Sequence, residues 1–186
     1  KSVAVTDHGN MFGTSDFYTK AKAAGIKPIL GTEAYVAGPK GMQDRSERVG
    51  HHLILLAKNQ EGYANLRYLA SKAYLEGFYF KPRIDRELLQ EYGEGLICLS
   101  GCLSGEFSRA LVGSSRAQRE SLAQAREVAG WFQKTFGDRY FIEIQDNGLD
   151  VQRQVTEAAL EISRELGVPP VATCDCHYVN REDAEA

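Results

Sequence analysis

The sequence predicts an α/β protein in which short buried strands alternate with amphipathic helices. Three observations support this fold class: β-branched runs alternate with segments of helical period, glycines follow the helical segments, and polar residues stand where strands end. Such an order produces right-handed crossovers and a mainly parallel sheet, either closed as an α/β barrel or open and doubly wound. The polar strand ends favour the barrel, because a barrel gathers its strand ends on one face.

Each expected strand is an apolar run bounded by glycine, proline or polar residues. In order, the strands are expected over residues 3–6, 27–36, 53–57, 95–100, 140–144 and 168–173. Each expected helix repeats its apolar residues at helical spacing, and three of them end just before a glycine. The helices are expected over residues 17–24, 59–77, 103–111, 115–136 and 151–166. The glycine-rich, charged stretch 38–50 predicts an exposed loop.

Length and charge restrict the class of protein further. The 186 residues allow one domain, and 43% hydrophobic with 25% charged residues excludes disorder, collagen and coiled coil as whole-chain interpretations. The net charge is −3, with 13 basic and 10 acidic residues in the first half and 9 and 15 in the second. Neither half has the strong positive charge of a nucleic-acid-binding module, so any nucleic acid would be held by a local patch.

The chain begins Lys1-Ser2-Val3, without an initiator Met or a signal segment, and an apolar run starts almost at once. We therefore expect a fragment of a longer cytoplasmic protein. Its four cysteines are expected to be free thiols or metal ligands, because a chain of this size suits a reducing compartment.

Several groups of possible metal ligands stand at the expected strand ends. His8 follows the first strand, and the alternation of a strand would place Asp175 and His177 on one face and the neighbouring cysteines on the other. Glu33 would be an isolated carboxylate in a buried strand, which is costly unless a positive group meets it. Cys102 stands in a glycine loop after a strand, where it suits a metal better than a catalytic role.

The pair His51-His52 precedes its strand instead of following it. If this strand returns antiparallel to the one that carries Glu33, its start lies on the same face as the other ligands. We offer this arrangement as a hypothesis.

Two other patterns have plainer alternatives. A structural zinc site made of four cysteines is disfavoured by the spacing, and Cys98, Cys174 and Cys176 are expected to be small buried hydrophobes. The stretch 71–83 interleaves basic and aromatic residues as single-strand binders do, although packing in the core or against another domain is the more frequent explanation.

In order, five segments resemble the motifs of the polymerase and histidinol phosphatase (PHP) domain family. They are Thr6-Asp7-His8-Gly9-Asn10, Gly31-Thr32-Glu33-Ala34-Tyr35, His52 to Asn59, Ser100 to Glu106, and Asp175-Cys176-His177-Tyr178. The resemblance covers essentially the whole chain. Residues 62–66 and 71–85 are similar to the PHP domains of bacterial DNA polymerase III alpha subunits in particular.

The resemblance implies a distorted seven-stranded β/α barrel of TIM-like type that binds up to three divalent metals, whether zinc, manganese or magnesium. The positions that match metal ligands are His8, Glu33, His52, Cys102, Asp175 and His177, and Asp7 matches a residue that supports the ligands. Over residues 1–186 the chain would be a PHP domain fragment, incomplete at both ends. The first strand with its His-x-His motif would be missing, as would the polymerase palm, fingers and thumb.

The same resemblance implies a part of a DNA-directed DNA polymerase, a nucleotidyltransferase, whose PHP domain hydrolyses phosphoesters as a 3′–5′ exonuclease. The implied partners are the primer 3′ end, the remaining polymerase domains, a proofreading exonuclease subunit and a sliding clamp. Two alternatives stay open: a free-standing phosphatase for a small ester, and a catalytically silent structural domain.

Overall fold

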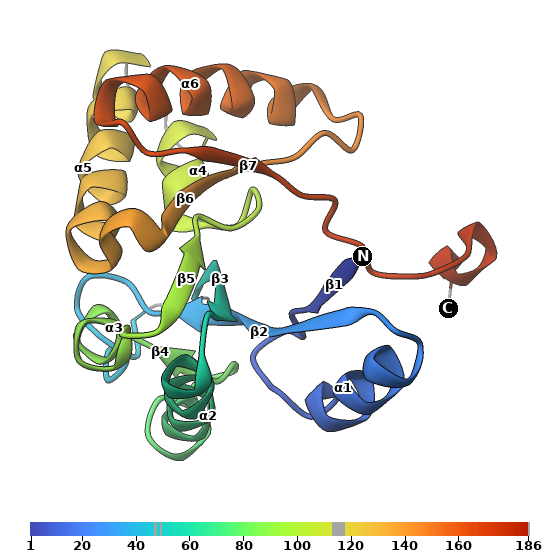
Figure 1. Ribbon diagram of the computed structural model, residues 1–186. Coiled ribbons are helices and arrows are strands. Elements are labelled where there is room, and N and C mark those ends of the chain that lie inside the picture. The colour runs from blue at the N-terminus through green and yellow to red at the C-terminus, as the bar shows by residue number, and fades with distance from the viewer. Residues whose placement is uncertain (47, 49, 113–117, 186) are drawn as a thin grey trace.

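The computed structural model describes residues 1–46, 48, 50–112 and 118–185 (Figure 1). Its strands are β1 (Ser2–Val5), β2 (Lys27–Val36), β3 (His51–Ala57), β4 (Arg83–Ile84), β5 (Leu96–Leu99), β6 (Tyr140–Ile144) and β7 (Pro170–Ala172). Its α-helices are α1 (Thr14–Ala23), α2 (Gln60–Leu75), α3 (Arg86–Tyr92), α4 (Glu106–Val112), α5 (Gln118–Phe136) and α6 (Asp150–Leu166). Two short 3₁₀ helices, Gly137–Arg139 and Arg181–Glu185, complete the described elements. None of the helices in this part of the chain has the length and hydropathy of a membrane span.

The seven strands form one curled sheet in the order β1-β2-β3-β5-β6-β7, with β4 paired to the end of β2. The pairs β1–β2, β2–β4, β5–β6 and β6–β7 are parallel, whereas β3 is antiparallel to both of its neighbours. Within the described residues no ladder joins β1 to β7, so the sheet curls as a half-barrel (Figure 1). The α/β class is confirmed, and the sheet is mixed because β3 runs against the others.

The helices cover the convex side of the curled sheet in two groups. In Figure 1, α1 and α2 lie beside the β1–β3 part, and α4, α5 and α6 lie beside β5, β6 and β7. One hydrophobic core runs through both groups and includes Leu55, Leu66, Leu96, Phe132 and Ile142, each at most 2% exposed. Burying a side chain of this kind contributes about 1.5–3 kcal/mol.

The structure differs from the sequence prediction around residues 83–92, where the sequence indicated no element. The strand β4 has only two residues, too few to show an alternation, and exists because it pairs with Tyr35 and Val36. The helix α3 begins at an N-cap, since the carboxylate of Asp85 accepts the backbone N–H of Leu88 at 3.0 Å.

Other boundaries also moved. The helix expected from residue 103 begins only at Glu106, because Gly101 has a positive φ of 82° and a loop intervenes. The first residues of the helix expected over 115–136 lie outside the described part of the chain, and α5 spans the rest. The last strand stops at Ala172, and Cys174 and Cys176 are exposed instead of buried, whereas Cys98 is buried as predicted.

Candidate metal centre

Three candidate ligands meet where β1 ends and β3 begins. The antiparallel register pairs His52 with Tyr35, and because side chains two apart share a face, Glu33 lies on the same face as both. His8, beyond the end of β1, forms a single parallel bridge with Glu33. The hypothesis that β3 returns antiparallel and brings His52 to Glu33 is therefore confirmed.

The Glu33 carboxylate lies between the two imidazoles. Its Oε2 is 3.0 Å from Nδ1 of His8, and its Oε1 is 2.6 Å from Nδ1 of His52. One donor atom from each of these three residues lies within 4.8 Å of the others, close enough for a single ion. Glu33 is only 3% exposed, whereas His8 is exposed. One side of the cluster is therefore buried, and the other is open to solvent.

Cys102 and His177 border this cluster. The Cys102 Sγ lies 3.6 Å from Nδ1 of His52 and 3.8 Å from Oε1 of Glu33. The Nε2 atoms of His8 and His177 are 3.3 Å apart, and Nδ1 of His177 is 2.9 Å from the backbone oxygen of Asp175. Five of the six predicted ligands thus form one connected group, which the sixth, Asp175, joins at its edge.

Among the described residues, Asp175 contacts the cluster through His177. Its carboxylate oxygen Oδ1 is 3.7 Å from Nδ1 of His177. The strand alternation expected for residues 173–177 is wrong, since β7 ends at Ala172 and Asp175 has a left-handed φ of 51°. A residue in that conformation turns the chain and ends the alternation of faces.

Asp7 acts on the site through its backbone in this structure. Its carbonyl oxygen accepts the backbone N–H of Glu33 and the hydroxyl of Thr32, each at 3.0 Å. Thr32 also donates to the carbonyl of Asn10, so one buried hydroxyl fixes the loop that carries His8. The position of Thr32 in a strand beside Glu33 is the sequence signal that would have indicated this role.

The charges of the cluster reinforce one another. Burial raises the pKa of Glu33, but the hydrogen bond from His52 and the positive charge of the imidazoles outweigh it and the pKa is lowered. Hydrogen bonds with Cys102 and then Glu33 raise the pKa of His52 to about 9. The cluster therefore holds a carboxylate and a bound proton where a divalent cation would take the proton's place.

Two further residues support the ligands and were not predicted as part of the site. The ring of Tyr35 packs edge-on against His52 with centroids 5.2 Å apart and lies 6.4 Å from His8. Glu143, 5% exposed, accepts the backbone N–H of Gly101 at 3.1 Å and the hydroxyl of Thr173. Glu143 lies near the end of β6, and nothing in the sequence indicates these partners.

Comparison with known proteins identifies the class to which this fold and site belong. The family model of the PHP domain matches residues 1–147, and the chain belongs to this family. The chain is also similar to curated proteins named DNA polymerase III subunit alpha. It is 50% identical over 190 residues to that of Thermus aquaticus and 48% identical over 187 residues to that of Borreliella burgdorferi.

The coverage of these matches is uneven. They include 100% and 99% of this chain but only 15% and 16% of the two relatives. The subunit of Campylobacter jejuni, 45% identical, gives the same proportions, with 100% of this chain and 16% of the relative. The chain therefore spans about a sixth of the length of the curated relatives it matches.

Proposed function

We propose that this chain is the PHP domain of a bacterial DNA polymerase III alpha subunit and that its metal centre hydrolyses phosphoesters. The similarity to alpha subunits along the whole chain supports the first part. The cluster of His8, Glu33 and His52, with donor atoms within 4.8 Å, is the observation that carries the second.

The donor set fits divalent metal ions. Imidazole, carboxylate and thiolate together are typical of zinc, and imidazole with carboxylate also suits manganese, whereas magnesium prefers the oxygen ligands. Once bound, such ions, up to three in a complete domain, bind phosphate oxygens and lower the pKa of a bound water to about 7.

The residues of this chain have distinct roles in the proposed reaction. Glu33, His8 and His52 hold an ion at the buried base, and Cys102 adds a thiolate beside them. His177 and Asp175 extend the ligand set towards the open side, where His8 is exposed and a substrate can enter. Asp7 keeps Glu33 and the His8 loop in register through its backbone carbonyl.

The proposed substrate is the 3′ end of a DNA primer, removed in the 3′–5′ direction. In the full subunit, the domain would act beside the polymerase domains that carry out nucleotidyl transfer. A proofreading exonuclease subunit and a sliding clamp would be further partners, and the assembly would be cytoplasmic.

Elemental analysis followed by nuclease assays of the full-length subunit tests the proposal. The primer should carry a mismatched 3′ end, and a small phosphate monoester serves as the competing substrate. We expect His52→Ala to lose bound metal and primer cleavage together, while Cys174→Ser, at an exposed cysteine outside the cluster, retains both. Cleavage of the small ester alone, or bound metal without any hydrolysis, would overturn the exonuclease function.

A further inference from the structure

A row of exposed aromatic rings joins the loop after His8 to the end of α2. Phe12 lies four residues after His8, and its ring centroid is 6.0 Å from that of Tyr74, which is 6.1 Å from that of Phe78. These three rings are 80%, 41% and 51% exposed. Large exposed apolar surfaces of this kind mark sites of interaction.

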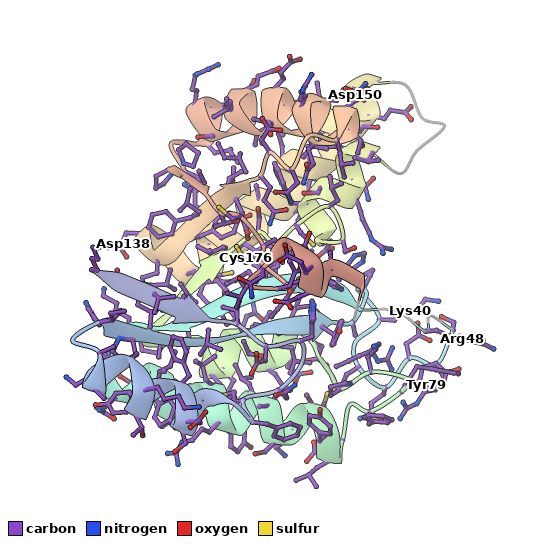
Figure 2. The ribbon with its side chains drawn as sticks, turned by 90° about the vertical axis from the view of Figure 1, so that its right-hand side faces the viewer. Lys40, Arg48, Tyr79, Asp138, Asp150 and Cys176 are labelled. Atoms are coloured by element: carbon purple, nitrogen blue, oxygen red, sulfur yellow. The ribbon has the colours of Figure 1, made fainter. Side chains whose placement is uncertain are left out.

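Cations lie over the neighbouring rings. The guanidinium of Arg45 lies 5.0 Å from the ring centroid of Tyr79, and that of Arg48 lies 4.8 Å from the ring centroid of Phe80. Figure 2 shows Lys40, Arg48 and Tyr79 together at one corner of the molecule, far from Asp138 and Asp150. Of the interleaved basic and aromatic residues noted in the sequence, Tyr74, Phe78, Phe80 and Lys81 are therefore exposed at the surface, whereas Arg83 is buried.

The row is also connected with the ligands through Lys81. Its ammonium lies 5.5 Å from the ring centroid of Tyr35, the ring that packs against His52. The carbonyl oxygen of Lys81 accepts the backbone N–H of Tyr79 at 3.0 Å, so a chain of contacts leads from the metal centre to the positively charged corner.

A buried arginine holds this surface in place. Arg83, 1% exposed, donates to the backbone oxygens of Met42 and Asp44 at 2.8 and 2.9 Å, and its guanidinium lies 5.2 Å from the ring of Tyr79. Arg45 donates to the carbonyl of Phe78 at 2.8 Å. These contacts hold the backbone that carries the rings in place before any partner arrives, which lowers the entropic cost of binding.

We propose that this surface, here named the aromatic platform, binds single-stranded nucleic acid. It consists of Phe12, Tyr74, Phe78, Phe80, Arg48 and Lys81. Bases would stack on the exposed rings while the cations contact phosphates, an arrangement that tolerates any sequence. The binding itself needs no metal, and it rests on the proposed function only in that the strand would end at the metal centre.

The arrangement of charge favours nucleic acid over a protein partner. The cores of protein–protein interfaces are depleted of charged residues, with arginine the exception. Here Lys81 and Arg48 stand among the rings, and Arg45 adds a third cation. They outnumber the nearby carboxylate of Asp44, while that of Glu76 pairs with Lys72. The platform therefore presents apolar faces and net positive charge together.

Fluorescence anisotropy with a labelled oligothymidylate tests the proposal on the 186-residue chain in EDTA. Since a stacked ring contributes about 1–3 kcal/mol, Phe12→Ala with Phe78→Ala should weaken binding at least about five-fold for each ring. Leu75→Ala is the matched control, because Leu75 is 81% exposed at the end of α2 but not aromatic. Arg48→Ala with Lys81→Ala should make the affinity less dependent on salt.

Circular dichroism and urea unfolding of each variant establish that it folds like the parent chain. Unchanged affinity in the aromatic variant, or an equal loss in Leu75→Ala, would overturn the proposal. If the parent chain does not bind the oligonucleotide and the aromatic variant instead loses its contact with the rest of the full subunit, the platform binds a protein partner. Binding in EDTA without hydrolysis in metal would leave the platform standing and remove the proposed exonuclease.

Discussion

The two segments that carry Cys102 and His177 are held together by one buried carboxylate, and we predict opposite effects for two substitutions of it. Glu143 accepts hydrogen bonds from the backbone N–H of Gly101, the Thr173 hydroxyl and the side-chain amide of Gln145 at 3.0 Å. Glu143→Leu should destabilise the chain. Glu143→Gln should stabilise it at neutral pH.

The hydrogen bonds of Glu143 determine how much stability Glu143→Leu loses. Leucine has no acceptor, so the buried N–H of Gly101 would lose its partner, at a cost of about 1–3 kcal/mol. Thr173 and Gln145 would still have each other, since the Gln145 amide already lies 3.3 Å from the Thr173 hydroxyl. Glutamine can keep the Gly101 bond through its oxygen and donate to Thr173 through its amide, provided that the Gln145 amide turns so that its oxygen, not its nitrogen, faces the new NH2 group.

The sign of the glutamine effect follows from the pKa. Burial raises the pKa of Glu143 above the usual 4.5, although the bonds from Thr173, Gln145 and Gly101 lower it in part. The folded state thus holds this proton more tightly than the unfolded state does. Ionisation therefore costs stability as the pH rises above 4.5, and glutamine avoids the cost.

Urea unfolding of the parent chain and both variants, without metal and from about pH 4 to 8, measures these differences. The free energy of unfolding of Glu143→Gln should exceed that of the parent chain by an amount that grows with pH. This difference should become constant above the pKa that Glu143 has in the folded state. A difference that does not change with pH, or a leucine variant as stable as the glutamine variant, would refute the reasoning.

Two further predictions concern the packing of α2 and the thiol of the site. Gly62→Ala would place its Cβ 1.8 Å from the carbonyl oxygen of Gly95, so the free energy of unfolding should fall by about 3 kcal/mol. The control Gly130→Ala in α5 should raise it by about 1 kcal/mol, because no described atom beyond the adjacent backbone of the helix lies within 4 Å of the added Cβ. Cobalt titration should show a thiolate-to-metal charge-transfer band that Cys102→Ser abolishes and Cys174→Ser retains; persistence of the band in the first variant would remove the thiol from the ligand set.

The sequence indicated the parts of the fold that follow from local pattern. Apolar runs predicted six of the seven strands, and the position of His51-His52 before its run correctly suggested an antiparallel return. The pair β4 and α3 could not be predicted, because β4 depends on a contact with β2 made only in the folded chain. The burial of Arg83 could not be predicted either, because arginine is rarely buried and its acceptors are backbone oxygens of a distant loop.

The site was predictable in its residue types but less so in its geometry. Glu33 and His52 could be matched through the hypothesis of an antiparallel return, although His52 was expected before its strand and lies within β3. Asp175 could not, since its left-handed φ of 51° ends the alternation two residues before His177. The hydrogen bonds of Glu143 depend on the register between β5, β6 and β7, which no single segment encodes.

The position of the centre follows from unequal strand lengths. The ten residues of β2 outreach the four of β1, so β1 pairs only with residues 27–30 and β3 pairs from Gly31 onward. At Gly31, β2 and β3 approach each other so closely that an added Cβ would lie 2.5 Å from the carbonyl oxygen of Leu55. Glu33 stands just beyond Gly31, where His8 leaves β1 and His52 enters β3. The ligands thus meet because β2 has the chain after β1 on one edge and β3 on the other at Glu33, and the regular backbone of β2 and β3 fixes the Glu33–His52 pair before any metal arrives.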